Sequence, residues 1–229
     1  MTPVLEARGV RKRFSGAVAL DGLSLAIAPG EAVGLFGANG SGKSTLVDVL
    51  SGRIPPDGGT VWFEGRDVTR LPMDARYRMG ISRTFQIPHP YRALTVLDAV
   101  RVTRFATAGA RGASAPGGMG DGAADGDLLA RSGLYDQRDL PCAKLSQGCL
   151  RRLEFARALA SKPKVLLLDE IFSALSAADE EDLIALLRSA QREDGAAFLL
   201  VSHNPPLLAG TCRRILVLEN GRIVRERTV

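Results

Sequence analysis

The sequence contains no apolar run that approaches the length needed to cross a bilayer, which is about 20 residues for a helix. Its first residues also lack the apolar stretch that a signal peptide carries. The longest aliphatic runs have the length of buried strands. We therefore expect the protein to remain in the cytoplasm.

Cysteine is also scarce. Cys142, Cys149 and Cys212 are odd in number and lack C-x-x-C or metal-ligand spacing, which favours reduced, unpaired thiols. The net charge of +5 is carried mostly by scattered arginines, a pattern typical of a solvated surface. Binding to nucleic acid or to an anionic membrane is the alternative, and charge alone does not separate the two.

The most informative stretch is the glycine-rich segment Gly37–Thr45, which matches the pattern G-x-x-x-x-G-K-[ST]. Ala32–Phe36 before it reads as a short buried strand, and Thr45–Ser51 after it reads as a helix that Gly52 ends. In this context backbone N–H groups and the helix N-terminus bind the phosphates of a nucleoside triphosphate. A glycine-rich turn with a chance lysine is the alternative, and the flanking strand and helix argue against it.

Two side chains of this phosphate loop have individual roles in that reading. Lys43 reaches the β- and γ-phosphates, and the hydroxyl of Ser44 ligates Mg²⁺. The nucleotide-binding residues predicted from the loop are Gly37, Asn39, Gly40, Ser41, Gly42, Lys43, Ser44 and Thr45.

Two adjacent carboxylates, Asp169 and Glu170, directly follow the aliphatic run Val165–Leu168. Such a run is typical of a central parallel strand that is buried on both faces and delivers its last residues into the ligand crevice. Asp169 is predicted to bind Mg²⁺ through water, and Glu170 to orient and deprotonate the attacking water. A solvated acidic pair at a strand end is the alternative, which the phosphate loop in the same chain disfavours.

His203 is one of only two histidines, and it follows Ala197–Val201, which reads as another central strand. A lone histidine is more often structural than functional. Its position at a strand end nevertheless directs this one to the γ-phosphate side of the crevice. We therefore place it with Lys43 and Glu170 among the candidate catalytic residues.

The remaining elements are arranged around this core, and a hydrophobic content of 45% is ample to build it. Strands are predicted over residues 4–14, 20–28, 60–63, 65–68 and 80–86, with a hairpin over 214–218 and 222–225. Helices are predicted over residues 74–79, 95–105, 127–134, 148–160 and 179–193. Ala108–Gly126 is rich in glycine and alanine without periodicity, and reads as a mobile loop.

Taken in order, the motifs resemble those of the nucleotide-binding subunits of ABC transporters over essentially the whole chain. They are the phosphate loop, Gln86, the signature Leu145-Ser146-Gln147-Gly148, the acidic strand before Glu170, and His203. The resemblance implies an α/β fold: a P-loop NTPase core with a mostly parallel sheet, an N-terminal antiparallel β subdomain and a helical signature subdomain. It also implies one ABC-type ATPase domain over residues 1–229, with the helical subdomain at approximately 88–160.

The resemblance adds roles that the local patterns do not assign. Gln86 is implied to be a catalytic residue and a Mg²⁺ ligand. Phe14 is implied to stack on adenine, although a Phe after three basic residues could equally anchor its strand in the core. Ser146 and Gly148 are implied to bind the ATP of a partner, because family members pair head to tail. ATP then joins two subunits, and its hydrolysis lets them separate.

The implied function is that of an ATP-hydrolysing motor on the inner face of the cell membrane, with ATP and Mg²⁺ as cofactors. Expected partners are a second copy or another ATP-binding subunit, separate membrane permease subunits and, indirectly, a substrate-binding protein. Nucleic acid is not expected. Residues 80–86 and 94–100 are similar to subunits that take up branched-chain and hydrophobic amino acids.

Three departures from the family pattern bear on the rate of hydrolysis. Cys149 stands where the signature usually has Gln and cannot make the hydrogen bonds of that amide. Ile171 follows Glu170 where Pro is usual, and Ser176 stands where Asp is more common. These departures imply slow hydrolysis or a non-identical partner subunit. The alternative function is a nucleotide-dependent regulatory or non-transport ABC ATPase with weak hydrolysis.

Overall fold

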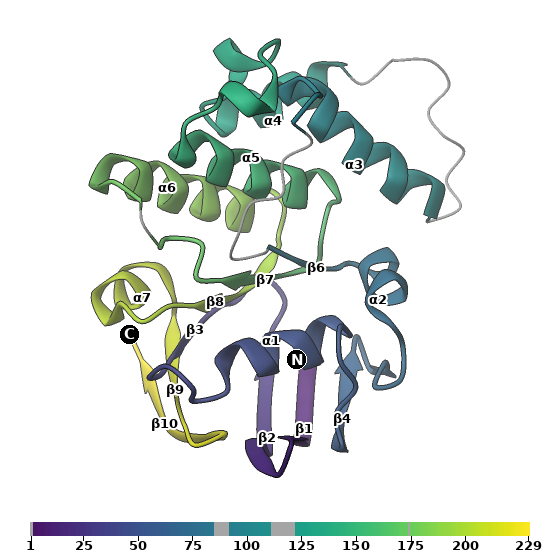
Figure 1. Cartoon of the computed structure of the whole chain (residues 1–229), viewed down its shortest axis with the longest axis vertical. Coiled ribbons are helices and arrows are strands. Elements are labelled where there is room, and N and C mark those ends of the chain that lie inside the picture. The colour runs from purple at the N-terminus through teal and green to yellow at the C-terminus, as the bar shows by residue number, and fades with distance from the viewer. Residues whose placement is uncertain (1, 85–91, 111–121, 174) are drawn as a thin grey trace.

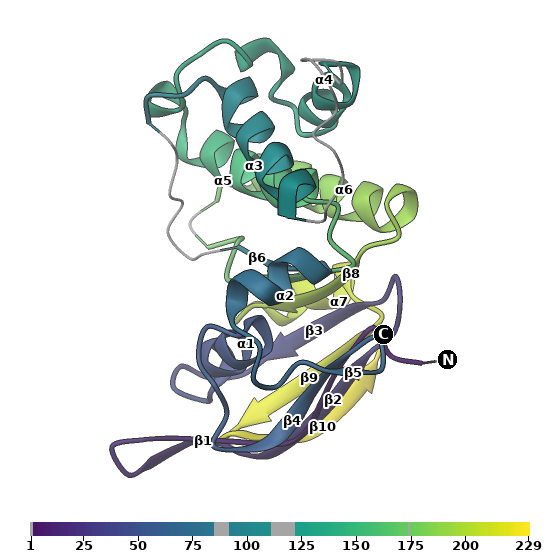
Figure 2. The same ribbon diagram turned by 90° about the vertical axis from the view of Figure 1, so that its right-hand side faces the viewer.

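The computed structural model describes residues 2–84, 92–110, 122–173 and 175–229. Over these residues the fold consists of two β-sheets and a layer of helices (Figures 1 and 2). The helices of that layer are α3 (Val96–Ala110), α4 (Gly122–Arg131), α5 (Gln147–Ala160) and α6 (Ala177–Glu193). They lie at one end of the molecule, with the N-terminal sheet at the other. The predicted α/β fold is confirmed.

The N-terminal sheet is antiparallel and has the order β2-β1-β4-β5. Its strands are β1 (Leu5–Phe14), β2 (Ala17–Ile27), β4 (Gly58–Phe63) and β5 (Arg66–Asp67). One face buries apolar side chains such as Leu5, Val10 and Val61, whereas the other carries charged ones. This alternation is the period-two pattern of a sheet with one face in the core.

The larger sheet has the order β10-β9-β3-β8-β7-β6. Its strands are β3 (Ala32–Phe36), β6 (Ile81–Arg83), β7 (Val165–Asp169), β8 (Ala197–Val201), β9 (Arg214–Glu219) and β10 (Arg222–Thr228). All of its neighbouring strands pair in parallel except β9 and β10, which form the predicted antiparallel hairpin. Because β3, β7 and β8 are parallel neighbours, their carboxyl ends meet at one edge, and the phosphate loop, Glu170 and His203 all start there.

The central strands β3, β7 and β8 of the larger sheet are buried on both faces, as their aliphatic side chains require. On β7, Val165 and Leu167 point into a core shared with the N-terminal sheet and α1 (Lys43–Ser51). Leu166 and Leu168 point the opposite way, into a core shared with α3, α5 and α6. Alternate residues of one strand therefore hold together the two halves of the molecule.

Short elements complete the described structure. They are α2 (Met73–Met79), α7 (Pro205–Thr211) and two 3₁₀ turns, η1 (Tyr135–Gln137) and η2 (Cys142–Lys144). Within the described parts of the chain, no helix has both the length and the apolarity needed to span a membrane.

The bounds predicted for the loop Ala108–Gly126 are wrong at both ends. Helix α3 continues to Ala110 and α4 begins at Gly122, while residues 111–121 lie outside the described structure. Part of the reason is a tertiary contact, since the buried carboxylate of Asp125 in α4 pairs with Arg104 of α3 at 2.8 Å. That ion pair links two helices, so local composition cannot reveal it.

Several other predicted boundaries differ from the structure by a few residues. The helix predicted to end at Leu134 ends at Arg131, because Gly133 adopts a left-handed backbone with φ of 61°. The strand predicted over residues 80–86 is described only over Ile81–Arg83, and residues 85–91 lie outside the described structure.

Candidate nucleotide-binding site

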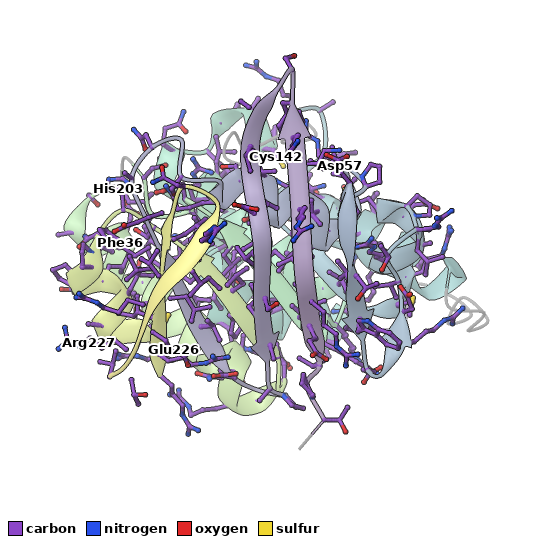
Figure 3. All side chains as sticks on the ribbon, turned by 90° about the horizontal axis from the view of Figure 1, so that it is seen from below. Phe36, Asp57, Cys142, His203, Glu226 and Arg227 are labelled. Atoms are coloured by element: carbon purple, nitrogen blue, oxygen red, sulfur yellow. The ribbon has the colours of Figure 1, made fainter. Side chains whose placement is uncertain are left out.

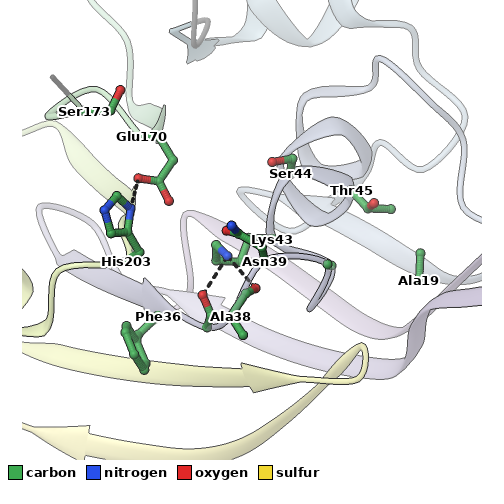
Figure 4. Close-up of a pocket in the computed structure, with 13 residues that line it drawn as sticks. Ala19, Phe36, Ala38, Asn39, Lys43, Ser44, Thr45, Glu170, Ser173 and His203 are labelled. Carbon is green, nitrogen blue, oxygen red and sulfur yellow. Dashed lines mark hydrogen bonds and ion pairs between the residues drawn. The ribbon is translucent and has the colours of Figure 1, made fainter.

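A cavity of about 790 Å³ opens where the carboxyl ends of β3, β7 and β8 meet. One wall is the phosphate loop, and the other carries Glu170, Ser173 and His203 (Figure 4). Phe36 and His203 lie on the same side of the molecule (Figure 3). Backbone from residues 37–45 thus faces acidic and imidazole side chains across a space large enough for a nucleotide.

The phosphate loop can take its shape only because of its glycines. Gly42 has φ of 107°, and a Cβ there would lie 2.4 Å from the carbonyl oxygen of Ala19. A Cβ on Gly37 would lie 2.4 Å from the carbonyl oxygen of Leu218 and 2.6 Å from Ser41 Oγ. Side chains at these two positions would force the loop away from β2 and β9.

Lys43 is buried at the base of the loop. Its Nζ donates hydrogen bonds to the carbonyl oxygens of Gly37 at 2.7 Å and Ala38 at 2.8 Å (Figure 4). These bonds hold the ammonium inside the curve of the loop, where a phosphate oxygen can reach it. The hydroxyl of Ser41 is also buried, and no described residue hydrogen-bonds to it. Both groups suit an anionic ligand with several acceptor oxygens.

Asp169 ends β7 as a buried carboxylate. Burial raises its pKa, and Arg83 and the hydroxyl of Ser44 oppose that rise. Its Oδ1 is buried and has no hydrogen-bond partner in the described structure. An unpartnered carboxylate oxygen beside a serine hydroxyl fits a hard divalent cation such as Mg²⁺. No group of three or more His, Cys, Asp or Glu in the described residues could hold a metal alone, so phosphates and water would complete the shell.

Glu170 and His203 form a pair at the cavity wall. His203 Nδ1 lies 3.0 Å from Glu170 Oε2, and the imidazole is the more exposed of the two groups (Figure 4). Glu170 has φ of 52°, a left-handed conformation that is costly for a residue with a Cβ. The strained backbone turns the carboxylate from the end of β7 into the cavity, where it can accept a proton from a bound water.

The signature lies at the start of α5. None of its residues is among the described residues that line the cavity. Ser146 caps the helix, since its Oγ accepts a hydrogen bond from the backbone N–H of Cys149 at 3.2 Å. A Cβ on Gly148 would lie 2.2 Å from Asp179 Oδ1 on α6. Ser146 and Gly148 thus lie outside the wall of this chain's cavity, and their binding of a partner's ATP stays a prediction.

Phe14 lies at the end of β1 and is 47% exposed, so the alternative that it anchors the strand in the core is wrong. Its ring packs against Lys12, whose Nζ lies 5.5 Å from the ring centroid. It does not line the cavity as described, whereas Ala19 and Phe36, which sequence reasoning missed, do. Neither residue belongs to a motif, so no sequence signal could have identified them. Gln86 lies outside the described residues.

Comparisons of the sequence and the structure with known proteins point to one protein family. A family model described as "ABC transporter" matches residues 20–173. The chain is 37% identical to the ribose import ATP-binding protein RbsA 1 of Rubrobacter xylanophilus, over 98% of this chain and 44% of that protein. It is 34% identical to the methionine import ATP-binding protein MetN of Brucella abortus, over 99% of this chain and 60% of that protein. The chain thus spans only about half the length of these two relatives.

A relative of similar length is the lipoprotein-releasing system ATP-binding protein LolD 1 of Caulobacter vibrioides. It is 36% identical over 97% of this chain and 95% of that protein. Among solved structures, the ADP conformation of the ATP-binding cassette MJ1267 superposes with a TM-score of 0.87 at 27% identity, covering 100% of this chain and 92% of that one. The dimeric, post-hydrolysis cassette MJ0796 with ADP and Pi gives 0.85 at 26% identity, covering 98% of each chain.

Proposed function

The chain belongs to the ABC transporter family of ATPases, and from that premise we propose that it is the ATP-hydrolysing motor subunit of an amino-acid importer. The observation that carries the proposal is the single cavity in which the phosphate loop faces the Glu170–His203 pair. The motor works at the inner face of the membrane, bound to separate permease subunits, and receives cargo indirectly from a substrate-binding protein.

In this proposal the phosphate loop binds the triphosphate of ATP. Backbone N–H groups of residues 37–45 cup the phosphate oxygens, and Lys43 contacts the β- and γ-phosphates. Ser44, Asp169 and Gln86 would hold Mg²⁺, which neutralises charge on the phosphates. Phe14 stacks on the adenine from the end of β1.

Glu170 acts as the general base. Its carboxylate takes a proton from the attacking water, whose oxygen bonds to the γ-phosphorus as the bond to the leaving ADP oxygen breaks. His203 holds the carboxylate through its 3.0 Å contact and faces the γ-phosphate side of the cavity. Such a base contributes about 10²- to 10⁴-fold to the rate, so Glu170→Gln lowers turnover by at least about 100-fold.

The second half of each site comes from a partner. Ser146 and the first N–H groups of α5 bind the γ-phosphate of ATP held by the phosphate loop of a partner subunit. Because neither Ser146 nor Gly148 lines this chain's cavity, head-to-tail pairing with itself or with a second ATP-binding subunit is supported. The MJ0796 cassette, which has a similar fold, is a dimer.

We assign branched-chain or other hydrophobic amino acids as cargo. The assignment rests on residues 80–86 and 94–100, and the methionine import relative is compatible with it. Relatives of comparable identity import ribose or release lipoproteins. Uptake of labelled leucine, methionine and ribose into vesicles that carry the subunit with its permease tests the assignment, and transport of ribose alone would refute it.

The second candidate is a regulatory ABC ATPase with weak hydrolysis. It is favoured by Cys149, because a thiol cannot make the hydrogen bonds that an amide would offer a partner. Its Sγ lies 3.3 Å from Arg152 Nη2 of the same helix. Steady-state ATP turnover with and without the permease separates the candidates, because the motor accelerates when coupled and the regulator does not.

The decisive experiment is the gel-filtration mass of Glu170→Gln with and without Mg-ATP. Removing the base traps ATP, so the motor model predicts a shift from 24.4 kDa to a dimer. The control is Lys43→Ala combined with Glu170→Gln, which binds ATP poorly and stays monomeric. A monomer at saturating Mg-ATP without a second cassette subunit would overturn self-pairing.

A further inference from the structure

Arg83 lies almost buried between two carboxylates of different elements. Its side chain is 7% exposed, on β6, beside the C-terminal half of the phosphate-loop helix α1. Its Nη1 lies 2.5 Å from Asp48 Oδ1 of α1 and 3.3 Å from Ser51 Oγ. Its Nη2 lies 3.9 Å from Asp169 Oδ2 of β7. None of these contacts follows from the sequence motifs.

The two carboxylates share the guanidinium unequally. Asp48 receives a direct, charge-assisted hydrogen bond, whereas the 3.9 Å separation from Asp169 is too long for one. Asp169 also keeps Oδ1 without a partner in the described structure. Asp169 therefore keeps one buried oxygen without a protein partner, close to the hydroxyl of Ser44, which lines the nucleotide cavity.

A direct ion pair between Arg83 and Asp169 would occupy the carboxylate oxygen that a cation needs. Arginine binds a carboxylate through two parallel N–H groups, which would occupy the oxygens of Asp169 and cancel its charge. The groups lie in a nearly dry environment, where such a pair is little screened. Asp48 prevents this by attracting the guanidinium toward α1.

We propose that Asp48 is a positioning residue that holds Arg83 away from Asp169 and thereby sets how strongly Mg²⁺ strengthens nucleotide binding. The inference rests on the proposed function, because it assumes that ATP and Mg²⁺ occupy this cavity. It predicts opposite effects for the two members of the pair. Without the charge of Asp48, Arg83 turns to Asp169 and competes with the cation; without Arg83, the cation has no competitor.

The test measures the dissociation constant of ATP for the full chain in excess EDTA and in saturating Mg²⁺, and takes their ratio. Outer-shell partners of metal ligands typically change metal affinity 10- to 100-fold, so Asp48→Asn lowers the ratio by roughly tenfold. Arg83→Gln raises it, and the double variant lies between the single ones. Binding in EDTA stays within about twofold of wild type in every variant, because the phosphate loop is unchanged.

Arg53→Gln is the matched control. Arg53 Nη1 lies 3.3 Å from the same Asp48 Oδ1, but its side chain is 57% exposed and its pair is screened by solvent. The ratio of the control equals that of wild type. If Arg83→Gln does not fold, Asp48→Asn against Arg53→Gln still decides the matter, since Asp48→Asn keeps the shape of the side chain.

Three results would overturn the inference: equal ratios for Asp48→Asn and Arg53→Gln, shifts of Asp48→Asn and Arg83→Gln in the same direction, or a wild-type ratio near one. Absence of ATP binding by wild type under both conditions would be a different outcome, because it refutes the proposed function itself.

Discussion

Arg76 is a fully buried guanidinium whose hydrogen bonds go to backbone carbonyls. Nη1 donates to Val49 and Leu50, both at 2.8 Å, in the last turn of α1. Nη2 donates to Thr69 at 2.9 Å and Nε to Leu71 at 3.0 Å. The side chain thus satisfies the C-terminal carbonyls of the phosphate-loop helix and places a positive charge at the negative end of its dipole.

Replacing Arg76 with Met keeps much of the volume and removes all four bonds. A hydrogen bond contributes about 1 kcal/mol net, and buried carbonyls left unpaired cost more. We expect Arg76→Met to lower the free energy of unfolding by about 4 kcal/mol, the sum of four such bonds. In a chain of this size that corresponds to a decrease in Tm of roughly 8–16 °C. Arg76→Lys, which keeps the charge without the planar fork, loses about half as much.

The effect of Arg76→Met does not vary between pH 5 and 8. Burial lowers the pKa of Arg76 to about 10, so the side chain remains charged throughout this range. The pKa of Arg76 is lower in the folded than in the unfolded protein, so burying the charged side chain lowers the free energy of unfolding. This loss of stability is complete below the folded pKa, and it disappears as pH rises through the folded and then the unfolded pKa.

Thermal and urea unfolding of the ligand-free protein measure the difference, and Arg78→Met is the control. Arg78 is on the same helix but 46% exposed, and it pairs with Asp74 at 2.6 Å on the surface. Exposed pairs contribute about 0–1 kcal/mol, so the control stays near wild type. If Arg76→Met and Arg78→Met differ by less than about 1 kcal/mol, the carbonyl bonds do not stabilise the fold as argued.

Three further predictions concern other parts of the chain. Gly148→Ala inserts a Cβ 2.2 Å from Asp179 Oδ1, and we expect it to lower the free energy of unfolding by about 1–3 kcal/mol in thermal unfolding. The control Gly210→Ala, whose Cβ would have no atom within 4 Å, is neutral or stabilising. Equal effects of the two substitutions would contradict the clash. A hydrogen bond from Lys12 lowers the pKa of Asp57 from its usual value. The loss of Tm in Asp57→Asn is therefore present at pH 7 and fades as pH falls through the folded pKa, and a loss that persists in acid would refute the reasoning. Burial raises the pKa of Cys212 to about 12, so a thiol reagent at about pH 8 modifies it in urea but not in the folded protein, as peptide mass spectrometry would show.

The parts of the fold that sequence could predict are those fixed by local pattern. The phosphate loop has a spacing set by one ligand, and Val165–Leu168 can only be a strand buried on both sides. Both predictions are confirmed as structure, and the roles of their residues stay predictions. The placement of Glu170 opposite Lys43 follows from parallel pairing, which the alternation of strands and helices implies.

Contacts between distant side chains could not be predicted in this way. The ion pair of Asp125 with Arg104 extends α4 into a segment whose composition resembles a loop. The position of Arg83 between Asp48 and Asp169 depends on which strand lies beside β7, and β6 has only three residues to signal it. Such contacts depend on the strand order and on side-chain rotamers, and neither produces a periodic pattern in the sequence.

The order of strands in the larger sheet constrains how the protein can be made. Strand β3, which leads into the phosphate loop, lies between β8 and β9, and these are encoded by residues 197–219. During synthesis the loop leaves the ribosome long before the strands that flank β3 exist. Its aliphatic strand must wait with unpaired backbone groups, a state prone to aggregation. Strand β3 therefore gains both of its neighbours only when residues 197–219 are present, and a chain cut before residue 197 leaves its backbone groups unpaired on both sides.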